Sequence, residues 1–207
     1  MDRASSRTEA VEAYHGLVGA TLRVLDALSV LEPDGAVLDD ARRTVADIAD
    51  RLERLPHLPE DPRMPSHDPR NPRFVPHERG LAPAMTIERE GGGELRGRVT
   101  FGLRFAGAAA VHGGAITLFF DDFLGRLANY GMVDNVARTA YLKVDYRQLT
   151  PLCTALVCKA RVVKVDGRKR YLRATLEHER GLLAEAEGLW VVGRTDPTDS
   201  QPPRHPV

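Results

Sequence analysis

Two glycines followed by a carboxylate inside an apolar run form the part of the sequence best suited to chemistry. After Gly113 and Gly114 the chain is apolar on nearly every side as far as Tyr130, which predicts a helix enclosed by the rest of its domain. The first N–H groups of a helix have no partner within it, and its dipole favours negative charge there. Asp121 lies within the apolar run, where a carboxylate is unfavourable unless it is paired, solvated or used.

Three nearby side chains compete for a role in this chemistry. His112 directly precedes the glycines, and without a second ligand or an orienting partner it suits fixing the loop better than acting as a catalytic base. Asp122 lies about 100° around the helix from Asp121 and is its natural rival. Cys153 has no His or acidic residue at a meaningful spacing, so we do not expect a nucleophile there. No residues have the spacing of a metal site, and no metal is predicted.

Residues 1–55 predict an antiparallel pair of helices that lies outside the main domain. Ser6-Arg7-Thr8-Glu9 has the form of a capping box and is expected to open the first helix, which ends at Pro33-Asp34-Gly35. The second helix has one apolar stripe and ends before Pro56. Because each helix has only one apolar face, the pair should dock on the main domain or on a partner subunit.

Eight prolines between residues 56 and 83 exclude a helix or a central strand and predict an extended linker. Residues 84–193 are then expected to form the main domain, built from short strands, and residues 194–207 a disordered tail. The strands expected from alternating apolar residues and flanking turn signals are Met85–Arg89, Glu94–Phe105, Thr139–Tyr146, Val157–Val165, Arg170–His178 and Leu182–Val192. Turns are expected at Gly91-Gly92-Gly93 and at Asp166-Gly167.

This order of elements indicates an α+β fold, with a mostly antiparallel sheet of five to six strands wrapped around one central helix. The strand that opens with Thr139 alternates, so strict alternation places Thr139 on the face opposite to Leu142.

Composition narrows the class of partner. Lys plus Arg and Asp plus Glu each number 29, so no overall field favours nucleic acid or an anionic membrane. We expect a small molecule or a second copy of the protein as partner. No apolar run reaches about 18 residues, and the N-terminus is polar, which favours a soluble protein without a signal peptide. Cys153 and Cys158 lie in what resembles one strand and point to opposite faces, so they cannot easily bridge, which fits a cytoplasmic setting.

The chain resembles the hotdog-fold acyl-CoA thioesterases of the phenylacetate-pathway (PaaI) type, in the 4-hydroxybenzoyl-CoA thioesterase superfamily. The resemblance rests on His112-Gly113-Gly114, Asp121 nine residues after the histidine, Thr139 opening the next strand, and Ala184-Glu185-Ala186-Glu187-Gly188 in the last strand. It extends from about Leu81 to Val192 and leaves the helix pair outside. A fold alone does not determine a reaction, which depends on the residues of the site.

The resemblance implies that Gly113 donates its N–H to the thioester carbonyl and that Asp121 activates water or attacks directly. Thr139 would help to hold the water or the carboxylate, while His112, Gly114 and Asp122 would lie against the substrate. No metal or redox cofactor is implied, because CoA arrives as part of the substrate. Candidates for holding the phosphates of acyl-CoA, chosen for their charge, are Arg147, Arg168 and Lys169, although a basic turn is often only a solvated edge.

Geometry adds the expectation of an oligomer. Gly113 and Asp121 are eight residues apart on one helix, which corresponds to about 12 Å along its axis. If both act on one thioester, two antiparallel helices from two subunits must supply them, so a homodimer or a dimer of dimers is expected.

Two other functions stay open at this stage. Ala106-Gly107-Ala108-Ala109-Ala110 has no polar side chain where many members of the superfamily carry one, which favours an acyl-CoA-binding regulatory module with little turnover. A hotdog dehydratase would instead need His112 paired with a carboxylate of a partner chain.

Overall fold

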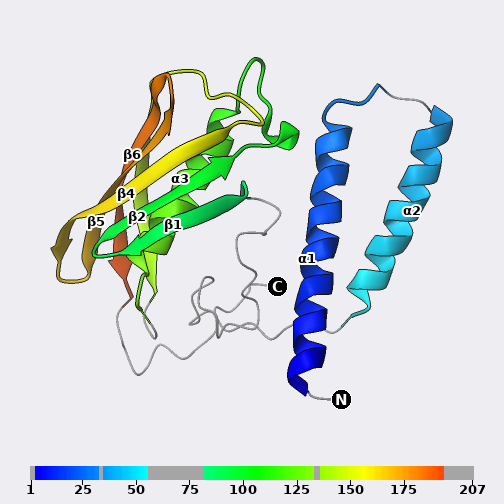
Figure 1. Ribbon diagram of the computed structural model, residues 1–207, viewed down its shortest axis with the longest axis horizontal. Helices are drawn as coiled ribbons and strands as arrows, with labels where there is room; N and C mark the ends of the chain where they lie inside the picture. Colours follow the sequence, from blue (N-terminus) through cyan, green and yellow to red (C-terminus); the bar gives the residue numbers. More distant parts are fainter. Residues whose placement is uncertain (1–2, 33–34, 56–81, 133–135, 194–207) are drawn as a thin grey trace, which may run out of the picture.

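The computed structural model of the chain describes residues 3–32, 35–55, 82–132 and 136–193. Its elements are the helices α1 (Arg3–Leu28), α2 (Gly35–Glu53) and α3 (Gly113–Ala128), the 3-10 helix η1 (Leu103–Phe105), and the strands β1 (Met85–Gly91), β2 (Glu94–Thr100), β3 (Ala137–Tyr146), β4 (Ala155–Asp166), β5 (Lys169–His178) and β6 (Gly181–Val192). Figure 1 shows α1 and α2 running in opposite directions beside the sheet.

All six strands join one antiparallel sheet in the order β1-β2-β4-β5-β6-β3, so β1 and β3 are its edges. Helix α3 packs on one face of this sheet and contacts β3, β4, β5 and β6. The strands curve around the helix (Figure 1). The expected α+β hotdog architecture, with one central helix, is therefore confirmed.

Aromatic side chains of α3 fill the space between helix and sheet. Phe119, Phe120 and Phe123 have no exposed surface, and the rings of Phe119 and Phe123 stack with their centroids 5.3 Å apart. Phe101 meets Phe119 edge to face at 5.9 Å. Each fully buried large apolar side chain stabilises the fold by roughly 1.5–3 kcal/mol relative to exposure.

One side of α3 is not covered, which differs from the expectation of a fully enclosed helix. Seven of its residues are buried, yet 38% of Leu118 is exposed and Asp122 is exposed as well. A single curved sheet covers only the side of the helix that faces it.

The C-terminal end of α3 is held by polar contacts. Asn129 is buried, and its amide nitrogen donates to the carbonyls of Gly125 at 2.9 Å and Ala137 at 3.1 Å. Its side-chain oxygen accepts the Ala137 N–H at 2.7 Å. Arg170 donates to the Ala128 carbonyl at 2.8 Å. These bonds fix the end of the helix against the start of β3 and against β5.

Both glycine turns are confirmed. Gly91, Gly92 and Gly93 have φ values of 138°, 62° and 78°, and Gly167 has a φ of 55°. These left-handed conformations suit glycine because it has no Cβ.

Three details of the sequence interpretation were wrong. Helix α1 begins at Arg3, so Ser6-Arg7-Thr8-Glu9 lies inside it and does not open it. The second strand ends at Thr100 because neither strand that pairs with it extends further. The first residue of β1 pairs with Val99, and the first residue of β4 pairs with Thr100. The chain then turns through η1. Cys153 precedes β4 with a φ of 51° and lies outside the strand that contains Cys158.

The helix pair is confirmed, and α1 contacts the main domain at η1. Most of the linker expected between 56 and 83 and the whole tail from 194 lie outside the described residues. Among the described residues, no helix combines the length and the apolar composition that crossing a membrane requires.

Candidate active site

The N-terminus of α3 presents one backbone donor that no described residue accepts from. His112 is the N-cap, and its Nδ1 accepts the N–H of Gly114 at 3.0 Å. The His112 carbonyl accepts the N–H of Ala115 at 2.9 Å. No acceptor among the described residues takes the N–H of Gly113. The histidine therefore has the expected structural role, and Gly113 is left as the free donor of the first turn.

Glycine at both positions has a steric reason. A Cβ on Gly113 would lie 3.3 Å from the phenol carbon and oxygen of Tyr146. A Cβ on Gly114 would lie 3.1 Å from the capping Nδ1 of His112. Both distances are tighter than ordinary van der Waals contact, so side chains here would disturb the turn and the cap.

Asp121 is half-buried, and it receives a hydrogen bond of 2.8 Å from the hydroxyl of Thr139. The structure thus brings together the two residues that the resemblance had paired. No donor among the described residues reaches the second carboxylate oxygen, Oδ2. One oxygen is therefore oriented by a neutral hydroxyl and the other is available to a reactant.

A β-bulge explains how Thr139 faces the helix, against the prediction from strict alternation. Thr139 pairs with the buried Trp190 and Tyr141 pairs with Leu189, so Ala140 is an extra residue in β3. The extra residue shifts the alternation by one. Thr139 and Leu142 consequently both point to the side of α3, which a regular strand would forbid.

Thr117 lies on the same side of α3 as Gly113 and Asp121, and Tyr146 contacts this side. The sequence alone did not reveal a role for either residue. The Tyr146 hydroxyl donates to the Gly113 carbonyl at 2.9 Å and lies 2.7 Å from the Thr117 hydroxyl. Thr117 is four residues after Gly113 and four before Asp121, so the three share one side of α3. That spacing could have revealed Thr117, whereas Tyr146 is found only through the pairing of β3.

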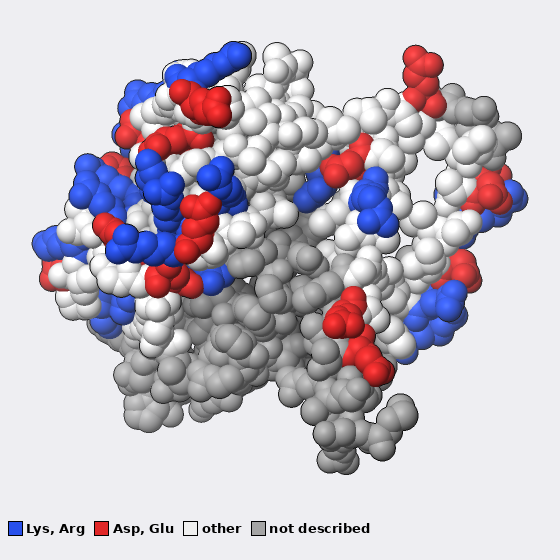
Figure 2. Space-filling model, in the orientation of Figure 1, with Lys and Arg blue, Asp and Glu red and all other residues white. Residues whose placement is uncertain are grey.

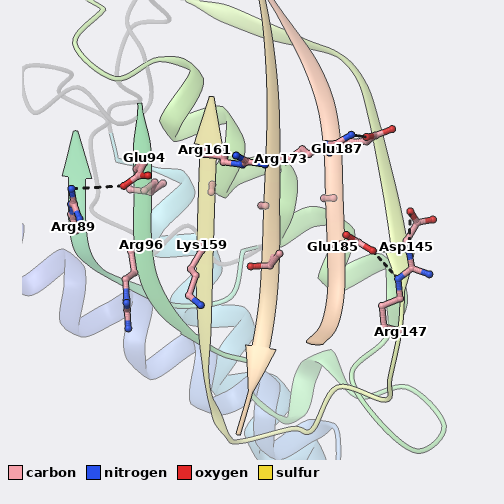
Figure 3. A pocket seen from close by; sticks show the side chains of 15 residues that line it. Arg89, Glu94, Arg96, Asp145, Arg147, Lys159, Arg161, Arg173, Glu185 and Glu187 are labelled. Carbon is pink, nitrogen blue, oxygen red and sulfur yellow. Dashed lines mark hydrogen bonds and ion pairs between the residues drawn. The ribbon is translucent and has the colours of Figure 1, made fainter. Parts of the chain in front are cut away.

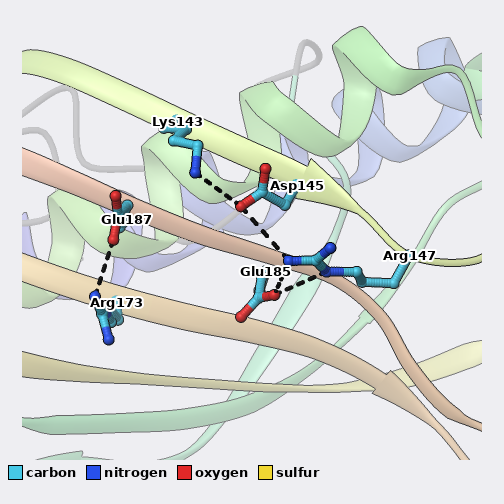
Figure 4. A network of polar contacts seen from close by, with 6 residues as sticks. All are labelled: Lys143, Asp145, Arg147, Arg173, Glu185 and Glu187. Carbon is cyan, nitrogen blue, oxygen red and sulfur yellow. Dashed lines mark hydrogen bonds and ion pairs between the residues drawn. The ribbon is translucent and has the colours of Figure 1, made fainter.

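The basic residues proposed for phosphates are not brought to Gly113. Arg147 points to the outer face of the sheet, away from α3, where it contacts Glu185 at 2.6 Å and Asp145 at 3.7 Å (Figure 4). The hydrogen bonds that Arg147 donates to the Glu185 carboxylate raise the pKa of Arg147. Arg168 donates to the Val192 carbonyl at 2.8 Å, and Lys169 is exposed at the start of β5.

A shallow hollow of about 690 Å³ lies over the outer face of the sheet (Figure 3). Charged side chains of both signs line it, and many form pairs across neighbouring strands, such as Arg173 with Glu187 at 3.1 Å. Figure 2 shows positive and negative side chains mixed over the sheet domain. This composition is typical of a solvated face, and it lies on the side of the sheet opposite to Asp121.

The described residues contain no group of three His, Cys, Asp or Glu side chains placed to hold a metal ion. Cys158 is buried, and burial raises the pKa of its thiol to about 12, so it stays protonated at neutral pH.

The chain is similar in sequence to known acyl-coenzyme A thioesterases. Acyl-coenzyme A thioesterase THEM4 from mouse is 34% identical over 83 residues, which cover 39% of this chain and 35% of the relative. THEM4 from cattle is 30% identical over 92 residues, covering 44% and 36% of the two chains. The chain spans about a third of the length of these relatives. No protein-family model matches the chain.

A solved crystal structure described as a thioesterase superfamily protein is similar over most of the chain. It is 29% identical with a TM-score of 0.70, and the alignment covers 86% of this chain and 94% of the other. The six-stranded antiparallel sheet and its central helix form a hotdog fold, and over most of its length the chain is similar to this thioesterase superfamily protein.

Proposed function

We propose that the protein hydrolyses acyl-CoA thioesters to a free acid and CoA. The observation that carries this proposal is the arrangement on α3, where the free N–H of Gly113 and the carboxylate of Asp121 lie on one side of a largely buried helix. The similarity to acyl-coenzyme A thioesterases of mouse and cattle supports the substrate class.

Gly113 is the proposed oxyanion donor. The thioester carbonyl oxygen becomes negative as the tetrahedral intermediate forms, and a fixed N–H at a helix N-terminus stabilises that charge. His112 holds the next N–H and Tyr146 holds the Gly113 carbonyl, so the donor is kept in one orientation. One fixed backbone donor is therefore available to the substrate carbonyl.

Asp121 is the proposed base. Its free Oδ2 would take a proton from water while the hydroxide oxygen bonds to the thioester carbon. Collapse of the intermediate breaks the carbon–sulfur bond, and the thiolate of CoA leaves and takes up the proton. In a direct attack the carboxylate oxygen would bond to the thioester carbon and the carbon–sulfur bond would break, which expels the CoA thiolate and leaves an acyl-aspartyl anhydride. Water would then open the anhydride, and the thiolate would take up a proton released in that step. Thr139 orients the carboxylate in either case. Neither route needs a metal or a redox cofactor.

One active site requires two copies of the chain. Gly113 and Asp121 are about 12 Å apart along the helix, which is too far for both to serve one carbonyl. Strand β3 is an edge of the sheet, and Tyr141 on it is 48% exposed. Leu118 on the uncovered side of α3 is 38% exposed. These two open surfaces support a two-fold dimer in which two α3 helices run antiparallel.

Arg168 and Lys169 are proposed to meet the phosphates of CoA. Arg168 lies on the turn before β5 and Lys169 is the first residue of β5. Both are beside the C-terminal end of α3, because the neighbouring Arg170 donates to the Ala128 carbonyl. In an antiparallel dimer this end faces the N-terminus of the second α3, where the thioester would bind. Arg147 is a weaker candidate because Glu185 and Asp145 already neutralise it on the far face of the sheet.

The direct test is release of free thiol from short, long and aryl acyl-CoAs, with Asp121→Asn as the isosteric variant. Loss of a positioned base is expected to lower kcat by about 10²–10⁴-fold. Asp122→Asn tests the rival carboxylate and should lower kcat much less than Asp121→Asn does. Equal rates for the wild-type protein and Asp121→Asn would exclude this mechanism.

A mixing experiment tests the shared site. Gly113→Pro removes the N–H at the first position of the helix, where proline is accepted, and its ring requires the Tyr146 side chain to shift. Asp121→Asn removes the base. Each variant alone should be nearly inactive. Refolded together in equal amounts, they form mixed dimers that contain one complete site each, so about a quarter of the wild-type activity should return. No recovery would place each site within a single chain.

The alternative is an acyl-CoA-binding module with negligible turnover. The exposed alanines at 106, 108 and 109 favour it, because they offer no side chain to assist the carbonyl. Saturable binding of a non-hydrolysable acyl-CoA together with no thiol release from any acyl-CoA would establish this function instead.

A further inference from the structure

Asp26 of α1 contacts the segment that leads from β2 to α3. Its Oδ1 accepts the backbone N–H of Arg104 at 2.9 Å, and the Arg104 guanidinium lies 3.4 Å from both carboxylate oxygens. The two side chains are only 30% and 13% exposed. Figure 1 shows the C-terminal half of α1 beside this segment. A residue of the helical extension is thus bonded to a residue 78 positions later in the chain.

The contact supplies a cap that the segment itself lacks. Gly102 is the N-cap of η1 and has no side chain to cap it. The Arg104 N–H is one of the unpaired donors of the first turn of η1, and Asp26 takes it. A Cβ on Gly102 would lie 3.0 Å from both oxygens of Asp26, so glycine is what allows the carboxylate to approach.

From η1 the connection continues directly to the proposed oxyanion donor. The Arg104 guanidinium stacks over the ring of Phe105, 4.3 Å from its centroid. The Phe105 carbonyl accepts the N–H of His112 at 2.8 Å, and Ala106 forms a bridge with Val111. His112 then caps α3 and leaves the Gly113 N–H free. Each of these steps is a short, specific contact.

We infer that Asp26 is a positioning residue for the active site, and that α1 holds η1 and the loop after it so that His112 and Gly113 keep their orientation. This inference rests on the proposed thioesterase function. It assigns the helical extension a part in the reaction through Asp26, which contacts η1 and acts on Gly113 only through it.

Three variants distinguish a positioning role of Asp26 from a role that only attaches α1 to the main domain. Asp26→Ala removes both the cap and the ion pair. Gly102→Ala displaces the Asp26 carboxylate, because the added Cβ lies too close to it. Both should lower kcat for thiol release by about ten- to a hundredfold with KM within about twofold, because misplacing a catalytic group acts on the transition state. Asp26→Asn keeps an oxygen that can accept the Arg104 N–H and should stay within about threefold of the wild-type rate.

Amide hydrogen exchange of the full chain gives the second readout. Exchange over residues 103–114 should rise in Asp26→Ala and Gly102→Ala, while exchange in β5 and β6 stays unchanged. Asp50→Ala on α2 is the matched control and should change neither measurement. Wild-type kcat and wild-type exchange in both variants would overturn the inference.

The two proposals fail in different ways. If the wild-type protein releases no thiol, the thioesterase proposal fails, and the exchange measurement alone decides the role of Asp26. Faster exchange over 103–114 would then support the link from α1 to the helix N-terminus, and unchanged exchange would refute it.

Discussion

Helices α2 and α3 both have an apolar side, but their surroundings differ completely. On α3, Phe119, Phe120 and Phe123 have no exposed surface, because the curved sheet covers them. On α2, Val45 is 49% exposed and Ile48 and Leu52 are each 40% exposed. Helix α2 also shows no substantial contact with another described element. A periodic apolar pattern therefore predicts a helix in both cases, while burial depends on what lies opposite.

The polar sides of the two helices differ as well. Helix α2 has ion pairs within the helix, such as Arg42 with Asp39 at 3.1 Å, and both side chains are more than half exposed. Pairs of this kind contribute only about 0.3–0.5 kcal/mol. Helix α3 instead uses Gly113, Thr117 and Asp121, whose contacts reach β3 or leave a group free. Stability should therefore depend strongly on α3 and weakly on α2.

Phe123→Ala should give the largest effect on stability. The side chain is fully buried and stacks on Phe119 at 5.3 Å, so its removal leaves a cavity. The free energy of unfolding should fall by about 3–5 kcal/mol. Urea unfolding followed by circular dichroism measures the change, and Phe123→Leu should recover much of the loss. A change below about 1 kcal/mol would mean that α3 is not the core of the domain.

Asn129→Ala should come next, because it removes polar contacts rather than volume. The backbone N–H and carbonyl of Ala137 would lose their partner in a buried place. We expect a loss of about 1–3 kcal/mol in the same unfolding measurement. Asn129→Asp keeps the acceptor for the Ala137 N–H and loses the donor, so it tests which of the two bonds matters. An unchanged unfolding midpoint for Asn129→Ala would show that water replaces the hydrogen bonds of the Asn129 side chain.

His112→Ala should have a smaller effect on stability, in the range of a lost helix cap. The Gly114 N–H loses its acceptor, and the expected cost is about 1 kcal/mol. His112→Asn offers another side-chain acceptor at the N-cap and should restore most of the loss. If His112 were instead a catalytic base, His112→Asn would fold normally and still lose thiol release.

The sequence was enough to predict the overall architecture because turns and periodicity are local. Gly91-Gly92-Gly93 and Asp166-Gly167 marked two hairpins, and the apolar run after Gly114 marked the central helix. The local pattern singled out Gly113 and a carboxylate in the helix, and the preference for Asp121 over Asp122 came from a resemblance, since nothing local distinguishes the two. The face of the sheet on which the Thr139 side chain lies depends on a bulge at Ala140, and only the pairing with β6 reveals this bulge.

Contacts between distant parts of the chain could not be predicted for the same reason. The sequence pattern indicates no more than a charged helix residue at Asp26. At Tyr146 it indicates one more residue of an alternating strand. Their roles come from Arg104 and Gly113, which folding places beside them. The end of β2 likewise depends on where β1 and β4 begin, although the apolar alternation continues to Phe105.

Ile48→Ser on α2 should have the smallest effect. Because 40% of Ile48 is already exposed and α2 makes no substantial contact with another described element, the free energy of unfolding of the isolated chain should change by less than about 0.5 kcal/mol. Sedimentation velocity of both proteins over a range of concentrations accompanies the unfolding measurement. A loss above 1 kcal/mol that grows with protein concentration would show that the apolar stripe of α2 is covered by a second copy. In that case the contrast between α2 and α3 would belong to the single chain and would disappear in the assembled protein.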